Sequence, residues 1–135
     1  MPALNFTTAN ATLVTKGLKP HTIRAMRKRP FKQGDLLTHY TGQRTPHCRS
    51  LGVSTAAVVL DCVIDPVLGQ VTLGGAIIPC RRVLALAQAD GFSSTEDFFR
   101  FFLRGLTGQL IGWESITTPT GEIIPTVLRE LDYLP

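Results

Sequence analysis

The segment from Gly17 to Arg24 (GLKPHTIR) carries the side chains whose types and spacing come closest to a reactive site. Lys19 lies in a turn just before a predicted strand, and Thr22 and Arg24 are two residues apart, so they share one face of that strand. An amine, a hydroxyl and a guanidinium that converge at one strand start could bind an anion. With a carboxylate added, they could form a nucleophile and its base. A loop lysine and an exposed strand threonine would explain the same residues without any site.

Basic residues are concentrated between residues 16 and 49. This segment holds nine of the fourteen lysines and arginines but a single acid, Asp35. The other five basic residues are outnumbered by nine acids, so the rest of the chain is net negative, although the whole chain has a formal charge of +4. If the basic segment folds onto one face, that face will attract a polyanion such as RNA. A solvated basic surface without a partner is the simpler alternative.

Five side chains of this segment are candidates for contacts with RNA. Arginines could bind phosphates or stack on bases, and a tyrosine could offer a stacking platform. The candidates are Arg24, Arg27, Tyr40, Arg44 and Arg49. A strand residue half-buried in the core would also account for Tyr40.

The composition is that of one globular domain. With 135 residues, 44% of them hydrophobic and 18% charged, the chain can bury one sizeable core without disulfides or a metal. It has no apolar run of about 18 residues, and its first residues lack the basic and apolar regions of a secretory signal. We therefore expect a cytoplasmic protein whose Cys48, Cys62 and Cys80 are reduced thiols in or near the core. No cofactor or metal is expected, because no pair among the three histidines has metal-ligand spacing with a carboxylate.

Hydrophobic periodicity and turn residues predict many short strands and two late helices. The expected strands are residues 3–7, 21–27, 35–41, 54–65, the two arms of a hairpin at 70–79, and 108–113. The expected helices are residues 9–16, 81–89 and one that begins at the capping box of residues 93–96. We predict an α+β domain over residues 1–114, a small and mostly antiparallel β-barrel decorated by two to three helices. Residues 115–135 form an appended C-terminal tail in this interpretation.

Three stretches, in this order along the chain, resemble the ASCH domains of the PUA-like superfamily. They are GLKPHTIR (17–24), PFKQGDLLTHYTGQRTPHCRSLG (30–52) and ALAQADGFSSTEDFFRFF (85–102). The resemblance covers roughly residues 4–114 and is to bacterial and phage members of uncharacterised type. It implies a PUA-like barrel that binds RNA or a nucleotide-like ligand in a cleft lined by Lys19, Thr22, Arg24 and Asp90.

One branch of the ASCH domains implies an alternative, an amidohydrolase that removes the acetyl group from N4-acetylcytidine. Carried over by motif, the lysine and threonine of that site fall on Lys19 and Thr22, and the glutamate is replaced by Asp90, whose side chain is one methylene shorter. Lys19 would take the proton of Thr22, which would attack the amide carbonyl, and Asp90 would pass the proton to the leaving amine. Ribonuclease activity is a property of some ASCH relatives that no residue of this chain singles out.

The charges of the expected helix 81–89 oppose its dipole. Asp90 lies at its negative end, and Arg81 and Arg82 lie at its positive end. Charges placed against the helix are candidates for another role, although Asp90 could simply pair with a basic neighbour or favour the turn at Gly91. A third functional class, an accessory protein that assembles through residues 115–135, also fits the sequence.

Overall fold

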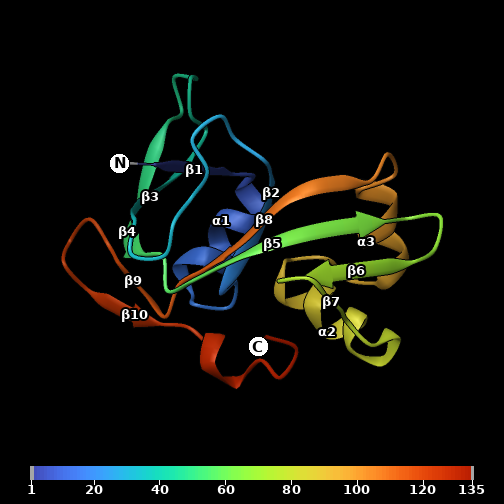
Figure 1. The fold of residues 1–135 in the computed structure, drawn as a ribbon. Helices are drawn as coiled ribbons and strands as arrows, with labels where there is room; N and C mark the ends of the chain where they lie inside the picture. Colours follow the sequence, from blue (N-terminus) through green and yellow to red (C-terminus); the bar gives the residue numbers. More distant parts are fainter. Residues whose placement is uncertain (1, 135) are drawn as a thin grey trace.

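The computed structural model describes residues 2–134, which form two five-stranded sheets and three α-helices (Figure 1). One sheet contains, in spatial order, β1 (Ala3–Phe6), β3 (Leu36–Thr41), β4 (Arg49–Thr55), β9 (Ser115–Thr117) and β10 (Ile123–Pro125). The other contains β2 (His21–Ala25), β8 (Leu106–Gly112), β5 (Val58–Asp65), β6 (Gln70–Leu73) and β7 (Ala76–Ile77). The helices are α1 (Thr8–Thr15), α2 (Cys80–Ala89) and α3 (Thr95–Phe101), and a short 3-10 turn, η1 (Leu128–Glu130), follows β10.

The expected α+β class is confirmed. The strand pairs are antiparallel except for β1 and β3, which run parallel. Across residues 2–134 the strand ladders divide into the two sheets and do not join into one closed ring. None of the helices within this range is long and apolar enough to cross a membrane.

The expectation of one continuous strand over residues 54–65 is wrong. The chain leaves the first sheet at the end of β4 and enters the second as β5, with Ala56 and Ala57 between them. The N–H of Ala56 donates to the Asp35 carbonyl and that of Ala57 donates to the Gly112 carbonyl, so the two residues bond to different neighbours. Neither a glycine nor a proline lies between β4 and β5, because β4 ends where the backbone changes its hydrogen-bonding neighbour and not at a tight turn.

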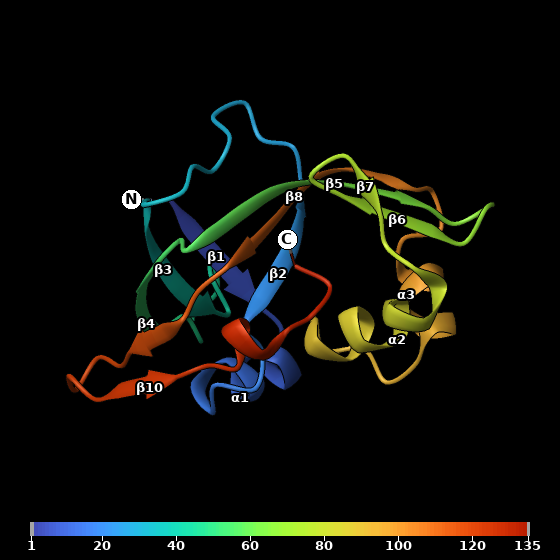
Figure 2. The same cartoon turned by 60° about the horizontal axis from the view of Figure 1, so that its bottom comes forward.

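Two hydrophobic clusters form the interior. The first lies between the β5–β6 end of the second sheet and helices α2 and α3, which cover one face of that end (Figure 2). Its buried members include Leu73, Leu86 and Phe98. The second cluster joins α1 to the first sheet around the fully buried Trp113. The cysteines depart from expectation, because only Cys62 is buried while Cys48 and Cys80 are exposed.

The segment after β8 packs against both clusters. β9 pairs with β4 and with β10, and Ile116 is buried in the second cluster. Farther on, Tyr133 is buried in the first cluster. Residues 115–134 therefore contact both halves of the molecule, and the segment after η1 runs back toward the middle of the fold (Figure 1).

His39 is a titratable side chain held without charge inside the second cluster. It is fully buried, on the same face of β3 as Leu37, and its ring packs against Phe6 and Trp113. Its Nε2 lies 2.6 Å from Ser54 Oγ, whereas Nδ1 has no partner among the described residues. Burial, with a smaller effect of the Arg24 charge, lowers the pKa of His39 to about 4.

We predict that this histidine makes the protein less stable as the pH falls from about 6.5 to about 4. In that window the unfolded chain binds a proton at His39 and the folded chain does not, so the free energy of unfolding decreases by on the order of 3 kcal/mol. Denaturant unfolding of the wild type and of His39→Gln at several pH values measures the effect, and the variant should lose less stability across the window. Identical pH dependence of the two proteins would contradict the assignment.

Candidate functional site

A cleft of about 600 Å³ lies between the β1–α1 region on one side and the connection from α2 to α3 on the other. Lys19, Thr22, Arg24 and Asp90 all line it. The structure thus brings together the four residues that the resemblance assigned to one cleft. The alternative of a loop lysine and an exposed threonine is wrong, because Lys19 is 2% and Thr22 is 4% exposed.

Lys19 and Asp90 form a buried pair at the bottom of the cleft. Lys19 Nζ donates to the backbone carbonyl of Asp90 at 2.5 Å and to its Oδ1 at 3.2 Å. Asp90 is the C-cap of α2, so the amine lies at the negative end of that helix. Burial lowers the pKa of Lys19, Asp90 opposes this shift, and the Arg24 charge adds a smaller lowering effect. Lys19 therefore releases its proton more readily than a surface lysine.

Two glycines allow the backbone to bring these residues together. Gly17 has a φ of +75°, and a Cβ there would lie 2.3 Å from the carbonyl oxygen of Pro125. Gly91 has a φ of +99°, and a Cβ there would lie 2.4 Å from Asn10 Oδ1. Any other residue at either position would be strained and would push a neighbouring segment away. The turns on either side of the Lys19–Asp90 pair therefore both depend on glycine.

Arg24 is fixed at the edge of the cleft. Its Nε donates to Thr22 Oγ1 at 3.2 Å, which confirms that the two side chains share a face of β2. Its Nη2 donates to the backbone carbonyl of Asn5 at 2.7 Å, and its guanidinium lies 5.1 Å from the centre of the Phe6 ring. Because the Thr22 oxygen accepts from Arg24, the hydroxyl proton remains free to donate to a ligand.

His21 and Tyr133 belong to the site although the sequence analysis did not place them there. His21 Nδ1 lies 3.1 Å from Asp90 Oδ1, and His21 Nε2 lies 2.6 Å from the Tyr133 hydroxyl. His21 faces the interior from the same motif as Lys19 and Thr22, so the alternation along β2 could have suggested it. Nothing in the sequence connects it to Tyr133, which is 112 residues away.

Phenylalanines form one wall of the cleft, which we call the aromatic wall: Phe92, Phe101 and Phe102. The ring centre of Phe92 lies 5.4 Å from that of Phe101 and 6.1 Å from that of Phe102. Phe98, Phe101 and Phe102 have the i, i+3, i+4 spacing that is typical of the core face of a helix, but Phe101 is 72% exposed. Its ring extends beyond the buried face of α3, where it can contact a ligand.

Three of the candidate RNA contacts lie along β3, β4 and the turn that joins them. Tyr40 is half-buried and is paired with Asn5 in the β1–β3 ladder. Arg44 lies in the turn with a φ of 66°, and Arg49 begins β4; both are exposed. The backbone N–H of Gln43 donates to the side-chain oxygen of Asn5 at 2.9 Å. Since Asn5 also lines the cleft, this turn begins at the cleft edge.

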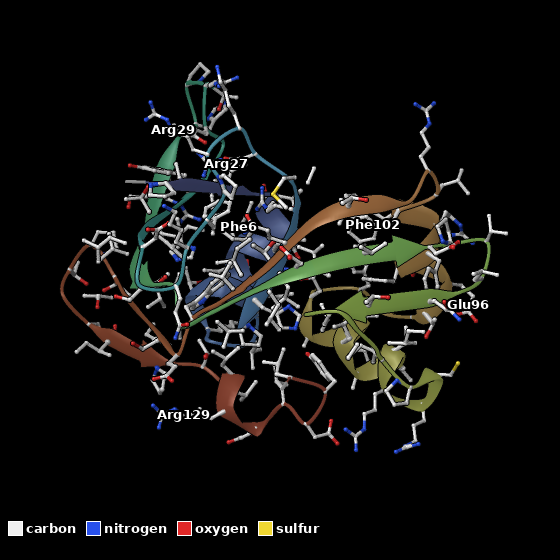
Figure 3. The ribbon with its side chains drawn as sticks, in the orientation of Figure 1. Phe6, Arg27, Arg29, Glu96, Phe102 and Arg129 are labelled. Carbon is white, nitrogen blue, oxygen red and sulfur yellow. The ribbon has the colours of Figure 1, made fainter. Side chains whose placement is uncertain are left out.

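Arg27 lies elsewhere, in the loop between β2 and β3. Its guanidinium lies 4.5 Å from the centre of the Phe31 ring, and it lines a separate hollow with Arg29 and Lys32. Figure 2 shows this loop on the side of the sheets opposite α1, and Figure 3 shows Arg27 and Arg29 together there. The basic segment therefore divides between two surfaces: Lys19, Arg24 and the β3–β4 turn lie at the cleft, and Arg27 and Arg29 do not.

Two of the charges that oppose the dipole of α2, Asp90 and Arg82, have partners in the structure. Asp90 pairs with Lys19, as the alternative based on a basic neighbour anticipated. Arg82 donates to the Asp132 carbonyl at 2.7 Å, and its Nε lies 3.7 Å from the Asp132 carboxylate. In the part of the chain that the structure describes, no three His, Cys, Asp or Glu side chains are grouped as a metal ion would require.

The cleft thus offers a hydroxyl, a guanidinium and a buried amine–carboxylate pair opposite an aromatic wall. This combination suits a planar ligand that has polar groups along one edge. No family model, curated protein or solved structure matches this chain.

Proposed function

We propose that the protein binds a nucleotide-like ligand, or one nucleotide of a single-stranded RNA, in the cleft between β2 and α3. The observation that carries this proposal is that the polar side chains of Thr22 and Arg24 and the aromatic wall line the same cleft. An unstacked base can lie against an aromatic side chain, because every base has a flat π face. The Thr22 hydroxyl and the Arg24 guanidinium can then bind the edge of that base or a phosphate.

The β3–β4 turn supports the extension of the proposal to RNA. Arg44 and Arg49 are exposed, and the hydrogen bond between Gln43 and Asn5 holds the start of the turn at the cleft edge. A base in the cleft would leave its flanking phosphates within the positive field of this turn. Tyr40, beside Asn5 on β3, would be available to a neighbouring base.

The resemblance to ASCH domains supports the same function, because PUA-like domains bind RNA or modified bases. In this proposal the two sheets are the halves of a PUA-like barrel, and the cleft lies where they meet. The encounter with RNA would occur in the cytoplasm, where the three cysteines, which form no disulfide, would remain reduced.

We predict that a short single-stranded RNA binds with an affinity that falls as salt rises, with a slope of about −0.7 per phosphate neutralised. Reversing the turn charges in Arg44→Glu/Arg49→Glu should weaken binding more than about tenfold, because two phosphate contacts become repulsive. Fluorescence anisotropy of a labelled oligonucleotide measures both effects.

The matched control is Arg81→Glu/Arg129→Glu, which changes the net charge equally at exposed positions away from the cleft. A third variant, Arg27→Glu, tests the separate loop and should have a smaller effect than the turn reversal. Equal loss in the turn and control variants, or a salt slope near zero, would reject RNA binding through the β3–β4 turn.

A second candidate function, hydrolysis of an acylated nucleoside, is favoured by the presence of Lys19, Thr22 and Asp90 in one cleft. Neutral Lys19 would take the proton of Thr22 as Oγ1 attacks the amide carbonyl. The Arg24 guanidinium, already 3.2 Å from Thr22 Oγ1, would stabilise the oxyanion. The proton would pass through Asp90 to the leaving amine, and water would then hydrolyse the acyl-threonine ester to the acid and the free threonine.

The resting geometry adds one requirement to this chemistry. Among the described residues no hydrogen bond joins Lys19 Nζ to Thr22 Oγ1, because the amine is bonded to Asp90 instead. Lys19 would have to turn away from Asp90 when the substrate enters. The low pKa that burial imposes on Lys19 favours this movement, since a neutral amine is held less strongly by the carboxylate.

For this second function we predict that the purified protein releases acetate from N4-acetylcytidine. Lys19→Ala and Thr22→Val should abolish the release, whereas Thr22→Ser, which keeps the hydroxyl, should retain part of it. The kcat/KM should rise with pH as Lys19 loses its proton and should level off below the ordinary lysine pKa of 10.5. Acetate can be followed by a coupled assay or by NMR.

Two results would reject the hydrolase. One is the absence of acetate release at high enzyme concentration, and the other is full activity of Thr22→Val. Neither result affects the binding proposal, which needs only the cleft and the β3–β4 turn.

A further inference from the structure

A continuous chain of buried polar groups connects the C-terminal segment, residues 131–134, to the cleft. The Tyr133 hydroxyl lies 2.6 Å from His21 Nε2, and His21 Nδ1 lies 3.1 Å from Asp90 Oδ1. The same oxygen accepts from Lys19 Nζ at 3.2 Å. All four side chains are at most 5% exposed, so water does not replace any of these contacts freely. Only Lys19 and Asp90 of the four line the cleft itself.

The hydrogen-bonding capacities of Asp90, His21 and Tyr133 determine which of them donates in each contact. An ionised Asp90 carboxylate can only accept, so His21 must donate to it from Nδ1. In the neutral imidazole this leaves a lone pair on Nε2, and the only group beside it among the described residues is the Tyr133 hydroxyl, which must donate. Burial raises the pKa of Tyr133, and the charges of Asp90 and Asp132 raise it further, so the phenol keeps its proton.

The C-terminal segment is held firmly enough to impose this arrangement. Leu131 and Leu134 pack against the first cluster on either side of Tyr133. The guanidinium of Arg82 donates to the Asp132 carbonyl, which ties the segment to the first turn of α2. The rings of His21 and Tyr133 meet edge to face, with centres 5.9 Å apart. The phenol therefore reaches His21 from a segment with both polar and apolar anchors.

We propose that Tyr133 is a positioning residue that completes the site from the C-terminal segment. Asp90 favours the tautomer of His21 that carries the proton on Nδ1, and the Tyr133 hydroxyl, by donating to Nε2, stabilises that tautomer and keeps the ring against Asp90. The ring so held keeps the Asp90 carboxylate in the orientation that pairs with Lys19. The charged group in contact with His21 is Asp90, and Lys19 is bonded to the same oxygen of that carboxylate. Arg24 follows three residues later on β2, and Asp132 directly precedes Tyr133. The state of the cleft amine thus depends on a residue that does not line the cleft.

NMR of the full chain without any ligand tests this role. In the wild type at neutral pH, ¹⁵N-labelled His21 should show a protonated Nδ1 and an unprotonated Nε2; His39→Gln and His47→Gln assign the other two histidine signals. Tyr133→Phe removes only the hydroxyl and should convert His21 to a mixture of tautomers. The pKa of Lys19, followed through its ¹³Cε signal, should then shift from the wild-type value, because Asp90 has lost a fixed donor.

The matched control is Leu131→Ala, which loosens the packing of the same segment but keeps the phenol. It should leave the His21 tautomer and the Lys19 titration as in the wild type. A wild-type His21 protonated on Nε2 would overturn the proposal without any variant. An unchanged His21 in Tyr133→Phe, or an equal change in Leu131→Ala, would also overturn it. None of these readings depends on whether the protein binds a nucleotide.

Discussion

The buried pair of Lys19 and Asp90 joins the two halves of this molecule. Lys19 follows α1, which packs in the second cluster, and Asp90 ends α2, which packs in the first. Burying two opposite charges is costly, and the attraction between them offsets that cost only where further hydrogen bonds satisfy both groups. The Asp90 carbonyl and the Nδ1 of His21 supply those bonds. If either partner were lost, the other would remain as an uncompensated buried charge, so the cleft and the packing of the halves depend on the same contact.

The cleft lies at this junction because each half contributes a different kind of surface. The first sheet provides the Asn5 carbonyl, which holds Arg24 of the second sheet in place. Helix α3 and the turn before it provide the aromatic wall, of which Figure 3 labels Phe102. Binding and chemistry would therefore use the same residues in different arrangements. The proposed binding needs no change in the resting structure, in which Lys19 is bonded to Asp90, whereas the proposed catalysis would require the amine to exchange that partner.

The division of the basic residues shapes the proposed interaction with RNA. Arg24 and the β3–β4 turn lie beside the cleft, whereas Arg27 and Arg29 line a separate hollow in the β2–β3 loop, which lies on the side of the sheets opposite α1 (Figure 2). Arg27 also covers the ring of Phe31, so part of its role is packing. Likewise Arg129 forms an ion pair with Glu114 at 2.9 Å. A count of charges along the chain cannot distinguish an arginine at the cleft from one that packs on a ring or forms an ion pair. That difference depends on the direction in which each loop leaves its strand, which the count does not include.

Local patterns determined much of this protein. Alternation along residues 21–25 places Thr22 and Arg24 on one face, and the Gly74–Gly75 turn closes the β6–β7 hairpin. A serine N-cap starts α3, although it is Ser94, one residue after the start of the expected capping box. These features depend on residues within a few positions of one another, which is the range over which periodicity and turn preferences act. The four cleft residues came from motif order, and the structure placed them together.

Only the tertiary structure decided the rest. The split of residues 54–65 between two sheets, the exposure of Phe101 and the contact between His21 and Tyr133 each depend on which distant segment is the neighbour. The Tyr133 hydroxyl bonds to His21, 112 residues away in the sequence, once the C-terminal segment packs in the first cluster. Burial there removes the water that would otherwise donate to the histidine. The sequence contains the polar side chains and their local order, whereas tertiary packing determines which of them form hydrogen bonds with one another.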